Sequence, residues 1–79
     1  MVFDWDEVKA QSNFKKHGID FGDAKGVFSD PWAIAEEDET SLGERRFNHI
    51  GMSAGRLLYV TCTWRDETCR IISARKATR

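Results

Sequence analysis

The hydrophobic period of this chain changes at Pro31, and this change constrains the fold more than any other feature. Before Pro31, apolar side chains recur at helical spacing; after it, apolar and polar residues alternate as in strands. The clearest strand is "RLLYVTCTW" at 56–64. Its alternation predicts a core face formed by Leu58, Val60, Cys62 and Trp64. Helices followed by strands predict an α+β domain with the helices packed on one sheet face.

Two helices are expected before Pro31. Residues 7–17 fit a helix with Asp6 as N-cap and Gly18 as its left-handed end. Its apolar face is expected to comprise the side chains near helical spacing, namely Val8, Ala10 or Gln11, Phe14 and His17. A second, shorter helix fits residues 21–28, with Asp20 as its cap.

Four short strands are expected after Pro31, at 32–39, 44–53, 56–64 and 68–74. The predicted fold is a single domain, residues 1–79, with two N-terminal helices packed on a four-stranded antiparallel sheet. Ser73 is a natural N-cap, so "ARKATR" is expected to begin a third, C-terminal helix. Because six residues are too few for a stable free helix, we expect this helix to be incomplete at Arg79.

The net charge of −1 conceals a strong asymmetry along the chain. Residues 1–44 hold 4 Lys and 11 Asp or Glu, whereas residues 45–79 hold 8 Lys or Arg and 2 acids. Seven of those eight cations are arginines, whose planar guanidinium binds phosphate or carboxylate through paired hydrogen bonds. Strand alternation places Arg70 and Arg65 on the face opposite the core. A helix beginning at Ser73 would add its N-terminus, which favours anions.

Composition argues against several other classes of protein. Cys62 and Cys69 match no zinc-ligand spacing, and His17 and His49 lie 32 residues apart without a ligand cluster. We expect no cofactor, no metal and no membrane segment, since no long apolar run or signal peptide is present. The expected location is the cytoplasm, with both cysteines reduced and buried. Alternatively, the two cysteines face each other across a hairpin.

An arginine-rich open sheet suits RNA or another polyanion, with Tyr59 or Trp64 as a stacking surface. A ribonuclease can work without a metal, because RNA supplies the 2′-hydroxyl nucleophile and the protein orients it and stabilises charge. A base near neutral pH is also required, and the candidates are His17, His49, Lys16 and Glu44. The competing interpretation is a non-catalytic module, whose arginines bind the acidic first half of the chain or an acidic partner.

Six short motifs carry a resemblance to a known family. They are "FDWD" at 3–6, "KHGIDF" at 16–21, "VFSDP" at 27–31, "GERRF" at 43–47, "IG" at 50–51 and "RIISARKAT" at 70–78. In this order and spacing, they resemble the BrnT toxin family from Phe3 to Arg79. The resemblance implies a RelE-like fold and a metal-independent ribonuclease that arrests bacterial growth as the toxin of a type II toxin-antitoxin pair.

The resemblance also implies partners and site residues. RNA is the implied substrate, and a BrnA-like antitoxin would neutralise the toxin in a hetero-oligomer that contacts operator DNA only through the antitoxin. The implied catalytic residues are Lys16, His17, Arg46, Arg70 and Arg75. The resemblance also implies Arg65 and Ser73 as RNA-binding or phosphate-binding residues, and we expect the cations Lys76 and Arg79, which follow them in the sequence, to bind phosphate as well. The alternative is a non-catalytic module that binds an antitoxin or nucleic acid through its arginine-rich sheet face.

Overall fold

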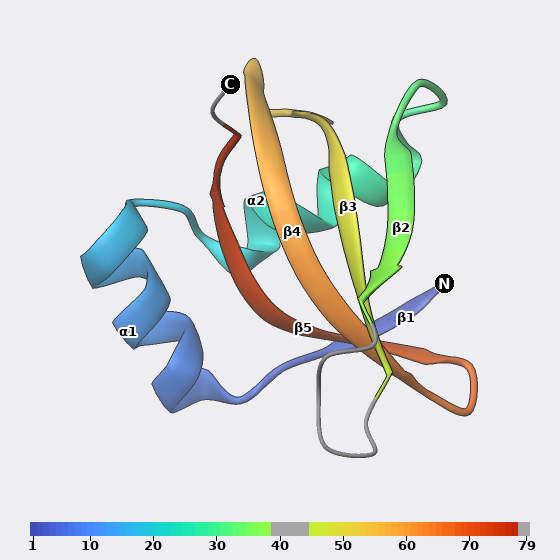
Figure 1. The fold of residues 1–79 in the computed structure, drawn as a ribbon. Coiled ribbons are helices and arrows are strands. Elements are labelled where there is room, and N and C mark those ends of the chain that lie inside the picture. The colour runs from blue at the N-terminus through green and yellow to red at the C-terminus, as the bar shows by residue number, and fades with distance from the viewer. Residues whose placement is uncertain (39–44, 78–79) are drawn as a thin grey trace.

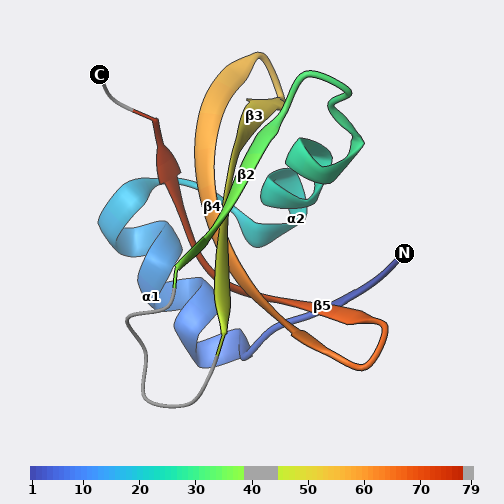
Figure 2. The same ribbon diagram turned by 45° about the vertical axis from the view of Figure 1, so that its right-hand side comes forward.

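The computed structural model describes residues 1–38 and 45–77. These residues form a five-stranded mixed sheet with helices on one face and at one edge (Figure 1). Along the chain the elements are β1 (Val2–Asp4), α1 (Glu7–His17), α2 (Phe21–Ala24), the 3-10 helix η1 (Lys25–Ser29), β2 (Ile34–Asp38), β3 (Arg46–Ser53), β4 (Arg56–Arg65) and β5 (Thr68–Lys76). Figure 1 shows α2 behind the middle strands, and in Figure 2 the turned view shows α2 to the right of β2, on one side of the sheet; both show α1 beside β5. No described helix is long and apolar enough to cross a membrane.

The first helix begins and ends as the sequence predicts. The Asp6 carboxylate accepts hydrogen bonds from the N–H groups of Val8 (2.8 Å) and Lys9 (3.2 Å). Gly18 closes the helix at φ 72°, a conformation that glycine adopts without a steric penalty. The second expected helix divides into α2 and η1, with Asp20 capping the Gly22 N–H at 2.6 Å. Local signals therefore predict these segments correctly.

The sheet has one strand more than the sequence predicts. Its order is β1-β5-β4-β3-β2, and β2 to β5 form the expected antiparallel meander. The additional strand, β1, pairs in parallel with the start of β5, with Phe3 opposite Cys69. The prediction of a four-stranded, purely antiparallel RelE-like sheet is therefore wrong in this detail. Residues 40–43, which separate the first two expected strands, and Glu44 lie outside the described residues.

The prediction of a third helix beginning at Ser73 is also wrong for the described residues. Strand β5 continues to Lys76, with Ser73 opposite Thr61 and Lys76 opposite Leu58. The Ala77 N–H extends this pairing by donating to the Leu57 carbonyl at 2.9 Å. Pairing with a neighbouring strand outweighs the local preference of Ser73 for a helix cap. Arg79 lies outside the described residues.

A β-bulge interrupts the pairing of β4 with β5. Thr61 lies opposite Ser73 and Cys62 opposite Ile71, so that Ile72 is the extra residue. Ile71 and Ala74 are consequently both buried on the core face, although they are three positions apart.

The hydrophobic core lies between the helices and one face of the sheet. The helical segments contribute Ile19, Phe21, Ala24 and Val27, and the sheet contributes Leu58, Val60, Ile71 and Ala74. Cys62 is buried as predicted, but Trp64 remains 38 % exposed near the β4–β5 turn. Two side chains expected on the inner face of α1 are exposed instead, Val8 by 75 % and Phe14 by 56 %.

Asp30 joins the segment after η1 to the sheet. Its carboxylate accepts hydrogen bonds from the N–H groups of Met52 (2.7 Å) and Trp32 (2.9 Å). These two bonds stabilise the carboxylate and lower the pKa of Asp30. Gly51 packs beneath this junction, where an added Cβ would lie 2.9 Å from the Ala33 Cβ. The close approach explains why this strand position carries no side chain.

Candidate active site

Asn13 attaches α1 to the outer edge of β5. Its amide Nδ2 donates to the Ala74 carbonyl (2.9 Å) and to the Ile19 carbonyl (3.2 Å), and its Oδ1 accepts from the Ala74 N–H (3.1 Å). Strand β1 pairs with β5 only from Thr68 to Arg70. Beyond that point, the Asn13 carboxamide takes the place of a neighbouring strand for the Ala74 backbone. A polar residue therefore determines which face of α1 packs inward.

A pocket of about 230 Å³ lies between α1 and β5 beside this contact. It is lined by Lys9, Ser12, Asn13, Lys16, His17, Ile72 and Ser73. The α1 members are spaced i, i+3, i+4, i+7 and i+8, which places them on one helix face. Two lysines, a histidine and two serines are thus among the residues that line one small pocket. These groups suit an anion with several acceptor oxygens, such as a phosphate.

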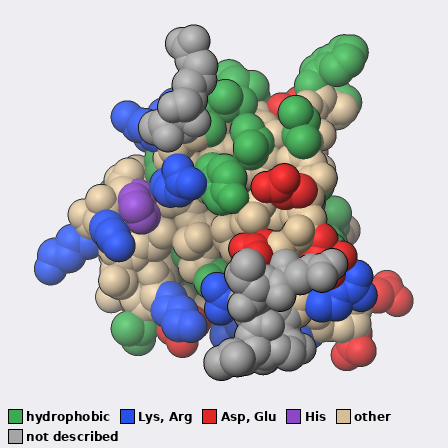
Figure 3. Space-filling view, viewed as in Figure 1, with side chains coloured by type: hydrophobic (Ala, Val, Ile, Leu, Met, Phe, Trp, Pro, Cys, Tyr) green, Lys and Arg blue, Asp and Glu red, His purple; other side chains and the backbone are tan. Residues whose placement is uncertain are grey.

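No acidic side chain of residues 1–38 or 45–77 forms a salt bridge with the cations in or next to this pocket. Among the described residues, no salt bridge involves Lys9, Lys16, His17, Arg75 or Lys76. Three other arginines have carboxylate partners: Arg45 pairs with Glu37, Arg56 with Asp23 and Arg70 with Asp4. Figure 3 shows Lys, Arg and His side chains over α1 and the neighbouring part of the sheet, and acidic side chains mainly over its other half. The positive potential is therefore concentrated on the α1 and β5 side.

The structure brings only some of the predicted site residues together. Lys16, His17 and Ser73 line the pocket, and Arg75 and Lys76 follow Ser73 along β5. The guanidinium of Arg75 lies over the Tyr59 ring, with its carbon 4.3 Å from the ring centre. Arg75 was predicted in the first turn of a C-terminal helix, but it lies in strand β5.

The remaining predicted arginines form a second group. Arg70 lies three residues before Ser73, 3.2 Å from the Asp4 carboxylate. Arg65 ends β4 next to the turn that leads to β5, and Arg46 begins β3. Both Arg46 and Arg65 make interactions within the structure. These three side chains are therefore not part of the pocket lining.

Three polar pocket residues were missed by the sequence prediction: Lys9, Ser12 and Asn13. The signal that identifies them is a polar stripe with the helical spacing of Lys9, Ser12, Asn13, Lys16 and His17. The apolar residues of the same helix suggested a different inner face. In a short helix at a sheet edge, hydrogen bonding to the exposed strand backbone competes with apolar burial.

His49 lies elsewhere, on the face of the sheet that the helices cover. Its ring packs against Phe28, with 4.5 Å between the ring centres. The nearby Cys62 and Cys69 are free and buried, as predicted. The Cys69 thiol, and secondarily His49, stabilise the Cys62 thiolate and lower the pKa of Cys62 to about 6. The same contact, together with burial, raises the pKa of Cys69.

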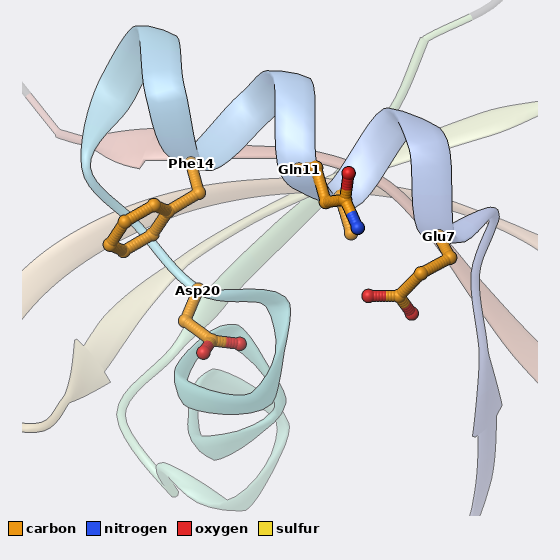
Figure 4. A pocket seen from close by; sticks show the side chains of 5 residues that line it. Glu7, Gln11, Phe14 and Asp20 are labelled. Carbon is orange, nitrogen blue, oxygen red and sulfur yellow. The ribbon is translucent and has the colours of Figure 1, made fainter.

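A second pocket of about 230 Å³ lies on the other side of α1 (Figure 4). It is lined by Glu7, Ala10, Gln11, Phe14 and Asp20. Two carboxylates and no cation give it the wrong charge for a phosphate, and one of them caps α2. The pocket between α1 and β5 is therefore the better candidate for an anionic substrate.

Metal ligands and similarity to known proteins bear on the class of this chain. Within the described residues, no group of three or more His, Cys, Asp or Glu side chains is arranged to hold a metal ion. A search of curated proteins finds no match. The family model described as "Ribonuclease toxin, BrnT, of type II toxin-antitoxin system" matches residues 5–79, nearly the whole chain. The chain therefore belongs to the BrnT family of ribonuclease toxins.

Proposed function

We propose that this chain is an endoribonuclease toxin that cleaves RNA without a metal ion and binds the scissile phosphate in the pocket between α1 and β5. The observation that carries this proposal is the convergence of His17 and Lys16 with Lys9 in one pocket that no described acidic side chain neutralises. Family membership supports the reaction class.

The pocket contains the groups that such a reaction needs. The RNA 2′-hydroxyl attacks the adjacent phosphorus, and the bond to the 5′-oxygen breaks. His17 accepts the 2′-hydroxyl proton, and Lys16 donates a proton to the leaving oxygen. Lys9, Ser12 and Ser73 stabilise the charge that develops on the non-bridging oxygens. The product of this step is a 2′,3′-cyclic phosphate, with a free 5′-hydroxyl on the other fragment.

In this proposal, the other predicted residues bind RNA phosphates on either side of the cleaved bond. Arg70, Arg65 and Arg46 bind backbone phosphates outside the pocket, and the same role is proposed for Lys76 and Arg79. Phosphate contacts of this kind are additive and depend strongly on salt.

Membership in this family also supports a proposal about the protein partner of the chain. Type II toxin-antitoxin systems contain an antitoxin protein, and we propose a BrnA-like antitoxin that forms a hetero-oligomer with this chain. In this proposal the toxin arrests growth in the bacterial cytoplasm until the antitoxin binds it. Operator DNA is contacted only through the antitoxin.

The test is RNA cleavage by the full chain in the presence of EDTA. His17→Gln and Lys16→Gln are each expected to lower kcat by about 10²- to 10⁴-fold, because each removes a proton-transfer group. Lys15→Gln is the matched control, since it removes the same charge from the neighbouring position and Lys15 does not line the pocket.

Intact RNA after incubation with the wild-type chain would contradict the proposal and favour the non-catalytic module. Equal activity of the Lys16→Gln and Lys15→Gln variants would place the chemistry outside this pocket. End-group analysis of the products distinguishes a cyclic phosphate from the products of hydrolysis by water.

A further inference from the structure

Arg75 is held by an aromatic ring instead of a carboxylate. It lies directly opposite Tyr59 in the β4–β5 ladder, and its guanidinium carbon lies 4.3 Å from the centre of the tyrosine ring. Arg75 is exposed to solvent and therefore accessible to a ligand. Arg45 also lies near a ring, that of Phe47, but at 5.8 Å and in a salt bridge with Glu37.

The stacked guanidinium lies close to the pocket. Ser73 lines the pocket and Arg75 follows it by two positions, which separates their backbones by about 7 Å along a strand. Alternation places both side chains on the sheet face opposite the core, because the intervening Ala74 is buried. A ligand bound at Ser73 can therefore extend over Arg75 without crossing the sheet.

The surface beyond Tyr59 is apolar. In the sheet register, Tyr59 lies opposite Ile50, and Ile50 lies opposite Ile34. Ile34 is one of the exposed large hydrophobic side chains of the molecule. Arg75, Tyr59, Ile50 and Ile34 thus form a row across β5, β4, β3 and β2. This row lies next to the pocket that Lys9, Lys16 and His17 line.

We propose that Arg75, supported by Tyr59, is a stacking site for an unpaired nucleobase adjacent to the scissile phosphate. This inference rests on the proposed function for the position of the phosphate. An arginine plane offers a weakly hydrated cationic surface on which any base stacks, whereas lysine offers only a point charge. A base paired in a duplex has no free face, so the site selects single-stranded RNA and tolerates different sequences.

The test uses two uncleavable ligands with equal phosphate charge. One is a 2′-O-methyl RNA decamer with bases, and the other is the corresponding abasic decamer; binding to the wild-type chain is measured by fluorescence anisotropy. Arg75→Ala is expected to weaken binding of the base-bearing decamer about 10- to 100-fold. Arg75→Lys is expected to weaken binding of the same decamer nearly as much, while binding of the abasic decamer stays within about twofold of wild type.

Arg56→Ala is the matched control, because Arg56 is a β4 arginine that pairs with Asp23 and not with a ring. It is expected to leave the ratio of the two affinities unchanged. If Arg75→Lys binds the base-bearing decamer as well as wild type, Arg75 acts through charge alone and the stacking site is refuted.

The two proposals fail in different ways. Cleavage of RNA by a wild-type chain that does not prefer the base-bearing decamer would refute the stacking site and leave the ribonuclease proposal intact. An Arg75-dependent preference for bases in a chain that cleaves no RNA would refute the ribonuclease and retain the stacking site as part of a binding module.

Discussion

Replacing Asn13 with alanine is expected to destabilise the fold by about 2 kcal/mol. Three hydrogen bonds disappear, two to the Ala74 backbone and one to the Ile19 carbonyl, which together contribute about 2.5 kcal/mol net. Alanine returns about 0.5 kcal/mol through its higher helix propensity. The result is a large fraction of the free energy of unfolding of a 79-residue domain, on the order of 4–12 kcal/mol.

Urea and thermal unfolding measure this effect. For a domain of this size, a loss of about 2 kcal/mol lowers Tm by roughly 8–16 °C. Hydrogen exchange provides a local readout, since the Ala74 amide loses its acceptor and is expected to exchange faster than its neighbours in β5. Ser12→Ala, one position earlier in the same pocket, is the control and is expected to change stability by less than about 0.5 kcal/mol.

Asn13→Asp adds a pH-dependent version of the same test. Its carboxylate would face two carbonyl oxygens, so folding raises the pKa of the new side chain. Because a raised pKa stabilises the folded state only while the group is protonated, this variant should be more stable near pH 4 than near pH 7, relative to wild type. If Asn13→Ala unfolds within about 0.5 kcal/mol of wild type, the carboxamide is not what holds α1 on β5.

Three further predictions concern other contacts. Asp30→Asn is expected to lower Tm at neutral pH, and the difference from wild type should shrink as the pH falls through the lowered pKa of Asp30, below about 4, because the native carboxylate is then protonated. Gly51→Ala should destabilise by about 1–3 kcal/mol in urea unfolding, since the new methyl group overlaps its neighbours; a neutral result would show that the junction can expand. Arg70→Ala should cost less than about 1 kcal/mol, because its salt bridge is partly exposed, and a larger loss in thermal unfolding would contradict this estimate.

The sequence predicts the parts of the fold that depend on local signals. The helix at Glu7–His17 has a side-chain cap at one end and a left-handed glycine at the other, and both are visible in the sequence. The alternation of β4 is equally clear. The strand β1 was not predicted, because three residues such as Val2–Asp4 become a strand only when β5 lies beside them.

The candidate site was predicted only in part for the same reason. Lys16 and His17 were identified from their motif, but their neighbours Lys9 and Ser12 depend on how α1 is oriented. That orientation is decided by the contact of Asn13 with a strand 61 residues later in the chain. Local patterns contain no information about such a contact, and the helix predicted at Ser73 fails because long-range pairing overrides local preference.

The extra residue in β5 has a consequence for every side chain that follows it. Strand residues alternate between faces, so if Ile72 paired regularly instead of forming a bulge, Arg75 would lie on the same side as Ile71 and its guanidinium would point into the hydrophobic interior. Ile72 shifts the phase by one residue and returns the cation to the solvent side. Deleting Ile72 is expected to remove the bulge and to leave Ala74 buried and Arg75 on the solvent side, because regular alternation from Ile71 then gives the same faces. The bulge thus lets β5 carry one extra residue while Ala74 stays buried in the core and Arg75 stays exposed.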